Sequence, residues 1–260
     1  MRNLFPHQYR RAVRAAGIVA FLAAPALHAQ ETAATAPSVM AWRDARLLGA
    51  FTLAAAVVMP ADRAAQRAMQ RDQVQRSSFY SHAADAFNAY GSPGVFAGSA
   101  AFYATGWATG RPDVARLGLR TAEAIMLSGV VTGGIKGIAG RARPYRSPQR
   151  PGDWRLFSGT RDGARQSFPS GHVTAAFAFA AAMDRELRLS HPGTARWAAP
   201  ALYGAAVMTG LARMHSDNHW ASDVVMGAGV GIVSGLVVAR FHSGRPQQWI
   251  DRRLLPRARQ

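Results

Sequence analysis

The chain has 260 residues, of which 49% are hydrophobic and 17% charged, a composition that fits one large folded domain and excludes a disordered chain. It contains no cysteine, which excludes disulfide scaffolds, thiolate metal sites and cysteine nucleophiles. The formal net charge of +17 predicts an anionic partner such as phosphate, nucleic acid or an anionic membrane. Nearly all the positive charge is arginine, because Lys136 is the single lysine among 31 basic residues.

Residues 1–29 have the pattern of a secretory signal peptide. Arginines lead into an apolar run from Ala15 to Leu27, and the small residue Ala29 follows. A run of 13 residues is short for a membrane span, which needs about twenty, so we predict a cleaved signal, with a retained anchor as the alternative. Cleavage would remove four arginines and no acidic residue, which lowers the net charge from +17 to +13.

Residues 30–42 are polar and rich in Ala and Thr, and we interpret them as a linker to a domain over residues 43–242. The domain alternates apolar runs with loops bounded by Gly and Pro, and it has no strand pattern. Ala and Leu dominate the runs and are good helix formers, so we predict an all-α fold, a six-helix bundle. The six runs are Leu47–Met59, Val95–Trp107, Leu117–Ile138, Val173–Met183, Ala198–Leu211 and Val224–Phe241.

Two other features of the domain bear on its packing. The segment Asp62–Tyr90 is polar with mixed charge, which favours a solvated helix or a lid. Glycines recur every fourth residue in two of the runs, and small residues on one helix face let backbones approach closely, so we interpret both stripes as packing signals. The stripes are Gly129, Gly133 and Gly137, and Gly227, Gly231 and Gly235.

Two short segments suggest anion binding. In the first, Lys136 and Arg143 are seven residues apart before Pro144, so we expect both cations on one face at a helix end, although a solvated basic face is the ordinary alternative. In the second, Pro-Ser-Gly-His ends in Ser170, Gly171 and His172 and opens a helix. A helix N-terminus attracts anions through its free N–H groups and its dipole, and Ser170 also fits an N-cap.

The third segment places His219 and Asp223 four residues apart, after Arg213. On a helix, the carboxylate could accept a hydrogen bond from one imidazole nitrogen and leave the other as a nucleophile. Helix stabilisation is the simpler interpretation of such a pair. A metal site is a further alternative, because His215 and Asp217 lie beside them, although the surrounding arginines would repel a cation.

Together the three segments match a known pattern: Lys, six residues, Arg-Pro; then Pro-Ser-Gly-His; then Arg, five residues, His, three residues, Asp. The sequence resembles the superfamily of type 2 phosphatidic acid phosphatases, bacterial class A acid phosphatases and vanadium haloperoxidases. The resemblance runs from Lys136 to Asp223 and includes order, spacing and placement relative to helices. Ala212 departs from the pattern, since the family usually has Ser before the Arg, which puts fine phosphate affinity in doubt.

The resemblance implies a metal-independent phosphomonoesterase that acts through a phosphohistidine intermediate, and it makes residues 43–242 the phosphatase domain. His219 would attack phosphorus, Asp223 would fix its tautomer, and His172 would be the general acid and base. The phosphate would be held by Lys136, Arg143, Ser170, Gly171 and Arg213. No cofactor is implied, and vanadate is expected as an inhibitor.

Several alternatives stay open. A vanadium-dependent haloperoxidase would use vanadate as its cofactor, bound to His219, and a non-catalytic membrane or interaction protein could retain the fold. The substrate could be a lipid phosphate, an isoprenoid diphosphate or a small ester. Nucleic acid is not expected, since the aromatics are not interleaved with Arg. We predict an exported, periplasmic protein, soluble or peripheral, whose basic C-terminal tail (243–260) contacts an anionic membrane surface; an integral membrane protein is the alternative.

Overall fold

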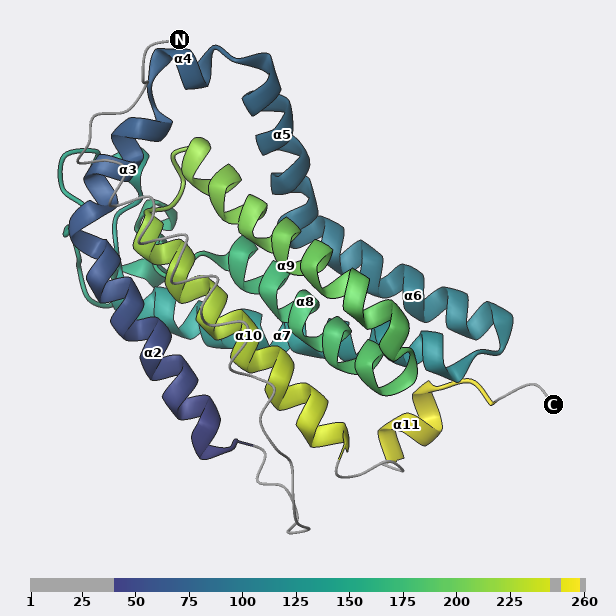
Figure 1. Ribbon diagram of the computed structural model, residues 1–260. Coiled ribbons are helices and arrows are strands. Elements are labelled where there is room, and N and C mark those ends of the chain that lie inside the picture. The colour runs from purple at the N-terminus through teal and green to yellow at the C-terminus, as the bar shows by residue number, and fades with distance from the viewer. Residues whose placement is uncertain (1–39, 244–248, 258–260) are drawn as a thin grey trace.

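The computed structural model of the protein describes residues 40–243 and 249–257. Helices make up most of this part of the chain, and within it there is no β-strand, only an isolated bridge between Arg141 and Trp154 (Figure 1). Each predicted apolar run lies in one long helix, apart from Met59, which follows the first helix, so the all-α prediction is confirmed. The long helices are α2 (Trp42–Val58), α6 (Val95–Thr109), α7 (Pro112–Ala139), α8 (Gly171–Ser190), α9 (Pro192–His215) and α10 (Ala221–Ser243).

Shorter helices fill the connections. The polar segment Asp62–Tyr90 folds into short helices that lie over the loop between α9 and α10 (Figure 1). There Gln66 Nε2 donates to Asp217 Oδ1 at 2.9 Å, and Asn88 Nδ2 donates to Ser216 Oγ at 2.9 Å. The shorter elements are η2 (Met59–Ala61), α3 (Asp62–Met69), α4 (Asp72–Gln75), α5 (Ser78–Ala89), η3 (Tyr90–Gly94), η4 (Pro144–Arg146), η5 (Ser158–Thr160), η6 (Gly163–Arg165) and α11 (Trp249–Leu254).

Helix α8 is the centre of the bundle. It packs against α7, α9 and α10, while α2 covers α10 and α6 covers α7 (Figure 1). The alanine-rich run of α8 is buried along its whole length. The glycine stripe of α10 explains the close contact with α8, because a Cβ at Gly231 would lie 2.4 Å from the carbonyl oxygen of Thr174 and one at Gly235 would lie 2.7 Å from Ala181 Cβ. For this stripe the packing prediction is confirmed.

The glycine stripe of α7 behaves differently. A Cβ at Gly129 or Gly133 would meet nothing within 4 Å, so these two residues do not bring helices together and the packing interpretation was wrong for them. Only Gly137 has a close neighbour, Thr160 Cγ2 at 3.1 Å. Glycines at every fourth position lie on one face of a helix, but their spacing does not show whether that face contacts another helix or a cavity.

The helices are longer than the apolar runs. Helical structure continues through the polar residues that border each run, so a count of apolar residues underestimates helix length. Three stretches are long and apolar enough to cross a membrane, namely Trp42–Met69, Pro112–Ala139 and Ala221–Ser243. These stretches point to membrane association, and they fit the integral alternative better than the predicted soluble form.

Several boundary predictions fall at the ends of the chain. The signal peptide (1–29) and residues 30–39 of the linker lie outside the described residues. Part of the segment predicted as a basic tail forms α11, and this helix is held to the bundle by Asp251, whose carboxylate accepts from Arg120 Nη2 at 2.6 and 2.7 Å. The domain limits of 43 and 242 stay a prediction.

Candidate active site

All three motifs lie at one end of the bundle, where α7 ends, α8 begins and α9 joins α10 (Figure 1). Helix α7 stops at Ala139, because Gly140 adopts a left-handed conformation with φ 57°. A Cβ at Gly140 would lie 1.8 Å from the carbonyl oxygen of Arg155, so only glycine fits. The expectation that Lys136 and Arg143 share a helix face was therefore wrong. Arg143 lies in the loop, which turns back toward the helix end.

The second motif forms the start of α8. Ser170 occupies the N-cap position with extended backbone, yet its hydroxyl makes no capping hydrogen bond, and Ser170 N donates to the carbonyl of Asp223 at 3.0 Å. Gly171 and His172 are the first two residues of the helix, so free N–H groups point out of its N-terminus. The structure thus leaves the buried Ser170 hydroxyl available to a ligand.

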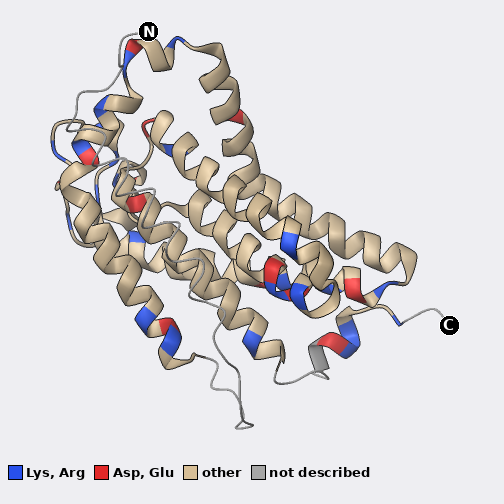
Figure 2. Ribbon diagram, viewed as in Figure 1, with Lys and Arg blue, Asp and Glu red and all other residues tan. Residues whose placement is uncertain are grey.

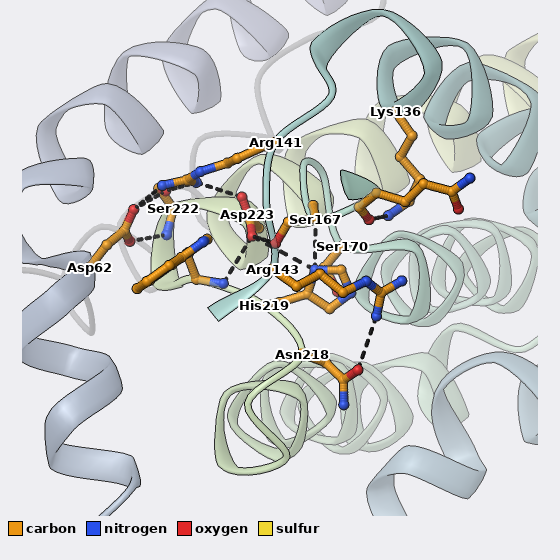
Figure 3. A network of polar contacts seen from close by, with 12 residues as sticks. Asp62, Lys136, Arg141, Arg143, Ser167, Ser170, Asn218, His219, Ser222 and Asp223 are labelled. Carbon is orange, nitrogen blue, oxygen red and sulfur yellow. Dashed lines mark hydrogen bonds and ion pairs between the residues drawn. The ribbon is translucent and has the colours of Figure 1, made fainter. Parts of the chain in front are cut away.

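In the third motif, His219 and Asp223 are not arranged as the sequence predicts. His219 precedes α10 and Asp223 lies in its first turn, so the two are not on one helix. His219 Nδ1 is 3.7 Å from Asp223 Oδ2, too far for a hydrogen bond, and instead it donates to the carbonyl oxygen of Ser167 at 2.7 Å (Figure 3). A carbonyl can only accept, so Nδ1 carries the proton and Nε2 keeps a lone pair.

Asp223 organises the site from behind. Its Oδ2 accepts from the Ser167 hydroxyl at 2.5 Å and from the backbone N–H of Trp220 at 2.9 Å. The second contact is half of a capping box, in which the third residue of a helix caps the residue before the first. Asp223 thereby holds Ser167, whose carbonyl accepts the hydrogen bond from His219 Nδ1. Asp223 acts on the imidazole through Ser167.

Burial and positive charge keep both histidines neutral. Burial lowers the pKa of His219 to about 3, an effect that Lys136 and Arg143 reinforce and Asp223 opposes. Burial also lowers the pKa of His172 to about 4, with further lowering by Arg213, Lys136 and Arg143. The cations act on both histidines because they lie close to them. A bound anion would offset these cations and raise the pKa of His172.

The cations are only partly satisfied by protein partners. Lys136 Nζ donates to the carbonyl of Gln166, and Arg143 Nη1 donates to Asn218 Oδ1 at 2.9 Å (Figure 3). Arg213 Nη1 donates to Asn88 Oδ1 at 3.1 Å. Burial and the neighbouring Arg143 lower the pKa of Arg213 to about 10. Several buried polar atoms have no partner among the described residues, and three of them are donors from the motif residues expected to hold phosphate, namely Arg143 Nε, Arg213 Nε and Ser170 Oγ. Buried donors are normally paired, so this arrangement fits an anion.

The metal alternative is not supported by the geometry. Within the described part of the chain, no group of three or more His, Asp or Glu side chains is arranged to hold a metal ion. Asp217 accepts from Gln66, and both oxygens of Asp223 are used by protein donors. The proposed ligand set of His215, Asp217, His219 and Asp223 therefore does not come together as a metal site.

A cavity adjoins the site between α6, α7 and α8. It has a volume of about 310 Å³, close to the lower limit for small-molecule pockets. Lys136, Gly171 and His172 line it at the site, and the rest of its wall is mainly apolar or glycine. Those lining residues are Ser92, Phe96, Ile125, Met126, Ser128, Gly129, Thr132, Gly133 and Ala175.

Sequence reasoning missed several residues that hold the site. Asn218 stands inside the third motif and Ser167 lies two residues before the second, but nothing in their spacing gave them a role. Arg141 is two residues before Arg143, and its fully buried position could not be told from a solvated loop arginine. Asp62 is 79 residues away from Arg141 in sequence, and no periodicity connects the two.

Comparison with known proteins agrees with this site. Residues 117–247 match the sequence model of the PAP2 superfamily. A segment of 72 residues, 28% of this chain, is 43% identical to a lipid A 1-phosphatase of Porphyromonas gingivalis, but it spans only 15% of that protein.

The fold is similar to that of the first transmembrane PAP2 type phosphatidylglycerolphosphate phosphatase from Bacillus subtilis. The TM-score is 0.58 at 20% identity, and the match covers 80% of this chain and 100% of that chain. The matched family region covers half of this chain and contains all three motifs. The chain therefore belongs to the PAP2 superfamily, as the motif pattern predicts.

Proposed function

We propose that this protein hydrolyses phosphate monoesters of lipids through a phosphohistidine on His219. The observation that carries the proposal is the set of unpartnered buried donors, Arg143 Nε, Arg213 Nε and Ser170 Oγ, gathered with Lys136 around two neutral histidines. Such donors match the oxygens of a phosphoryl group, whose negative charge shifts during transfer.

The first half-reaction follows from the tautomer of His219. The Nε2 lone pair attacks phosphorus in line, and the P–O bond to the alcohol breaks with its electron pair leaving on oxygen. His172, protonated when the phosphate is bound, gives its proton to that oxygen. The Ser167 carbonyl keeps the proton on Nδ1 and stabilises the charge on the phosphorylated ring.

The second half-reaction reverses these roles. Neutral His172 takes a proton from a water molecule while the water oxygen attacks phosphorus. The P–N bond then breaks and returns His219 as a neutral imidazole. Lys136, Arg143 and Arg213 bind the equatorial oxygens in both steps. In this scheme the charge is carried by side chains alone, so we expect activity without a metal ion.

The cavity supports a lipid as the leaving group. Its apolar wall, with Phe96, Ile125 and Met126, begins beside Lys136 and His172 and would receive an aliphatic chain attached near the phosphate. The two relatives named above are phosphatases whose names also refer to lipids. An isoprenoid diphosphate has the same combination of anion and apolar chain and belongs in the same test.

The surface supports a bundle embedded in the membrane. Charged residues gather toward the two ends of the bundle, and the middle of the helices is almost free of them (Figure 2). Large apolar side chains face outward in that middle zone, such as Leu53 on α2 and Val130 on α7. At the end away from the site, Trp42, Trp107 and Trp197 are 76%, 47% and 73% exposed. Exposed tryptophans at helix ends are typical of a membrane interface.

Two experiments test the proposal. Purified full-length protein in detergent is assayed for phosphate release from long-chain, short-chain and isoprenoid phosphates, with His219→Ala as the inactive control; equal activity of that variant would exclude His219 as nucleophile. Cell fractionation tests location. Recovery in membranes after carbonate washing supports an embedded bundle, whereas release by osmotic shock or salt supports the exported soluble or peripheral form.

A further inference from the structure

A fully buried ion-pair cluster lies behind the proposed nucleophile. Arg141, in the loop after α7, stands between Asp62 of α3 and Asp223 of α10 (Figure 3). Arg141 Nη2 donates to Asp62 Oδ2 at 2.6 Å, and Nη1 donates to Asp223 Oδ1 at 2.6 Å. All three side chains have no exposed surface. Asp62 also lies outside the region that matches the superfamily.

Ser222 ties the same cluster to the first turn of α10. Its hydroxyl donates to Asp62 Oδ2 at 2.6 Å and accepts from Arg141 Nη1 at 2.7 Å, while its backbone N–H donates to Asp62 Oδ1 at 2.8 Å. Arg141 is held further by the carbonyl of Pro151, at 2.9 Å from Nε. Its guanidinium also lies 4.8 Å from the ring centre of Trp154. The guanidinium therefore has one fixed orientation.

The cluster is connected to His219 by a continuous series of contacts. Asp62 and Arg141 hold Asp223, Asp223 Oδ2 accepts from the Ser167 hydroxyl at 2.5 Å, and the Ser167 carbonyl accepts from His219 Nδ1 at 2.7 Å. Two buried carboxylates share one guanidinium, so each depends on Arg141 for charge compensation. Removing Asp62 would leave the hydroxyl and N–H of Ser222 without their acceptor. It would leave Arg141 Nη2 with only the Pro151 carbonyl, at 2.8 Å, so both residues could shift.

We propose that Asp62, acting through Arg141, is a positioning residue that aims the Nε2 atom of His219 at phosphorus. This inference rests on the proposed function of His219. Asp62 does not touch the phosphate site, so its loss should slow the chemical step and leave phosphate binding intact. A merely structural aspartate would have no such selective effect.

The test compares Asp62→Asn with Asp44→Asn in the full-length protein in detergent. Asp44 is a matched control, because it is also a buried aspartate that pairs with an arginine, Arg240, and joins α2 to α10 at the end away from the site. Partners that orient metal-binding histidines contribute about 10- to 100-fold to activity, and we take the same range for this orienting aspartate. We expect kcat of Asp62→Asn to fall by at least about tenfold, with KM and the inhibition constant of inorganic phosphate within about twofold of wild type.

A second variant, Arg141→Lys, keeps the charge but cannot reach both carboxylates, and we expect the same selective loss of kcat. Asp44→Asn should keep the wild-type kcat. Wild-type kcat in Asp62→Asn, or an equal loss of kcat in Asp44→Asn, would overturn the inference. If Asp62→Asn does not fold, Arg141→Lys decides by the same two measurements. A wild-type protein that binds inorganic phosphate but releases none from any phosphate ester would contradict the proposed function itself, and the positioning role with it.

Discussion

Leucine placed at Gly129 or Gly133 should shorten the longest alkyl phosphate that the proposed site accepts. Both glycines line the cavity beside Lys136, and an added Cβ meets nothing within 4 Å at either position. Gly134 is a matched control on the same helix, since it is equally open but does not line the cavity. Leucine is a better helix former than glycine by up to about 1 kcal/mol, so none of the three variants should lose stability.

The expected effect follows from the area that leucine would take from the substrate. One helical turn separates Gly129 from Gly133, and a side chain there would displace about three to four methylene groups of a bound chain. At about 0.8 kcal/mol for each buried methylene, the loss is about 2.4–3.2 kcal/mol. This loss corresponds to a reduction in kcat/KM of about 60- to 200-fold for a long-chain ester.

The assay measures kcat/KM for a series of alkyl phosphates of increasing chain length in one detergent. Wild type and Gly134→Leu should gain activity with each added methylene, while Gly129→Leu and Gly133→Leu should reach a plateau at a shorter chain. Short esters that do not extend to the glycines should react at wild-type rates in all variants. The reasoning is refuted if Gly133→Leu keeps the wild-type dependence on chain length, or if it loses short and long esters equally.

Two further predictions concern the histidines. His172→Ala should reduce turnover of alkyl phosphates by about 10²- to 10⁴-fold and of p-nitrophenyl phosphate by much less, because only a poor leaving group needs the proton; equal losses would argue against a general acid. Acid should destabilise the wild type more than His219→Gln. The pKa of His219 is about 3 when folded and about 6.5 when unfolded. Between these values the unfolded chain binds one more proton than the folded chain, so the free energy of unfolding decreases as the pH is lowered. Melting temperatures at pH 7.5 and 4.5 check this, and equal shifts in both proteins would contradict it.

The sequence predicted the helices and the gathering of the three motifs because both depend on local patterns. Apolar runs rich in Ala located the six long helices, and the spacing of the three motifs located Lys136, His172 and His219 at one end of the bundle. These local patterns did not predict the path of the loops that connect the helices and the motifs. Gly140 ends α7 before Arg143, so the two cations meet through a loop and do not share a helix face.

The parts that sequence reasoning missed depend on contacts between distant segments. Asp62 reaches Arg141 only after α3 folds back over the start of α10. The Ser167 carbonyl accepts the hydrogen bond from His219 Nδ1 that was expected to go to Asp223. The glycine stripes show the same limit. The two stripes have the same spacing, but one packs against α8 and the other faces a cavity, and only the tertiary structure separates them.

The central claim is that a phosphoryl group is transferred to His219, and trapping that intermediate tests it most directly. Enzyme is mixed with ³²P-labelled lipid phosphate, quenched in alkali, digested and analysed by mass spectrometry. The account predicts an acid-labile, alkali-stable phosphate on the peptide that contains His219, at a higher level in His172→Ala with a good leaving group, because hydrolysis of the intermediate is then slowed. Phosphate on another residue, or turnover in wild type and His172→Ala with no covalent label in either, would contradict it.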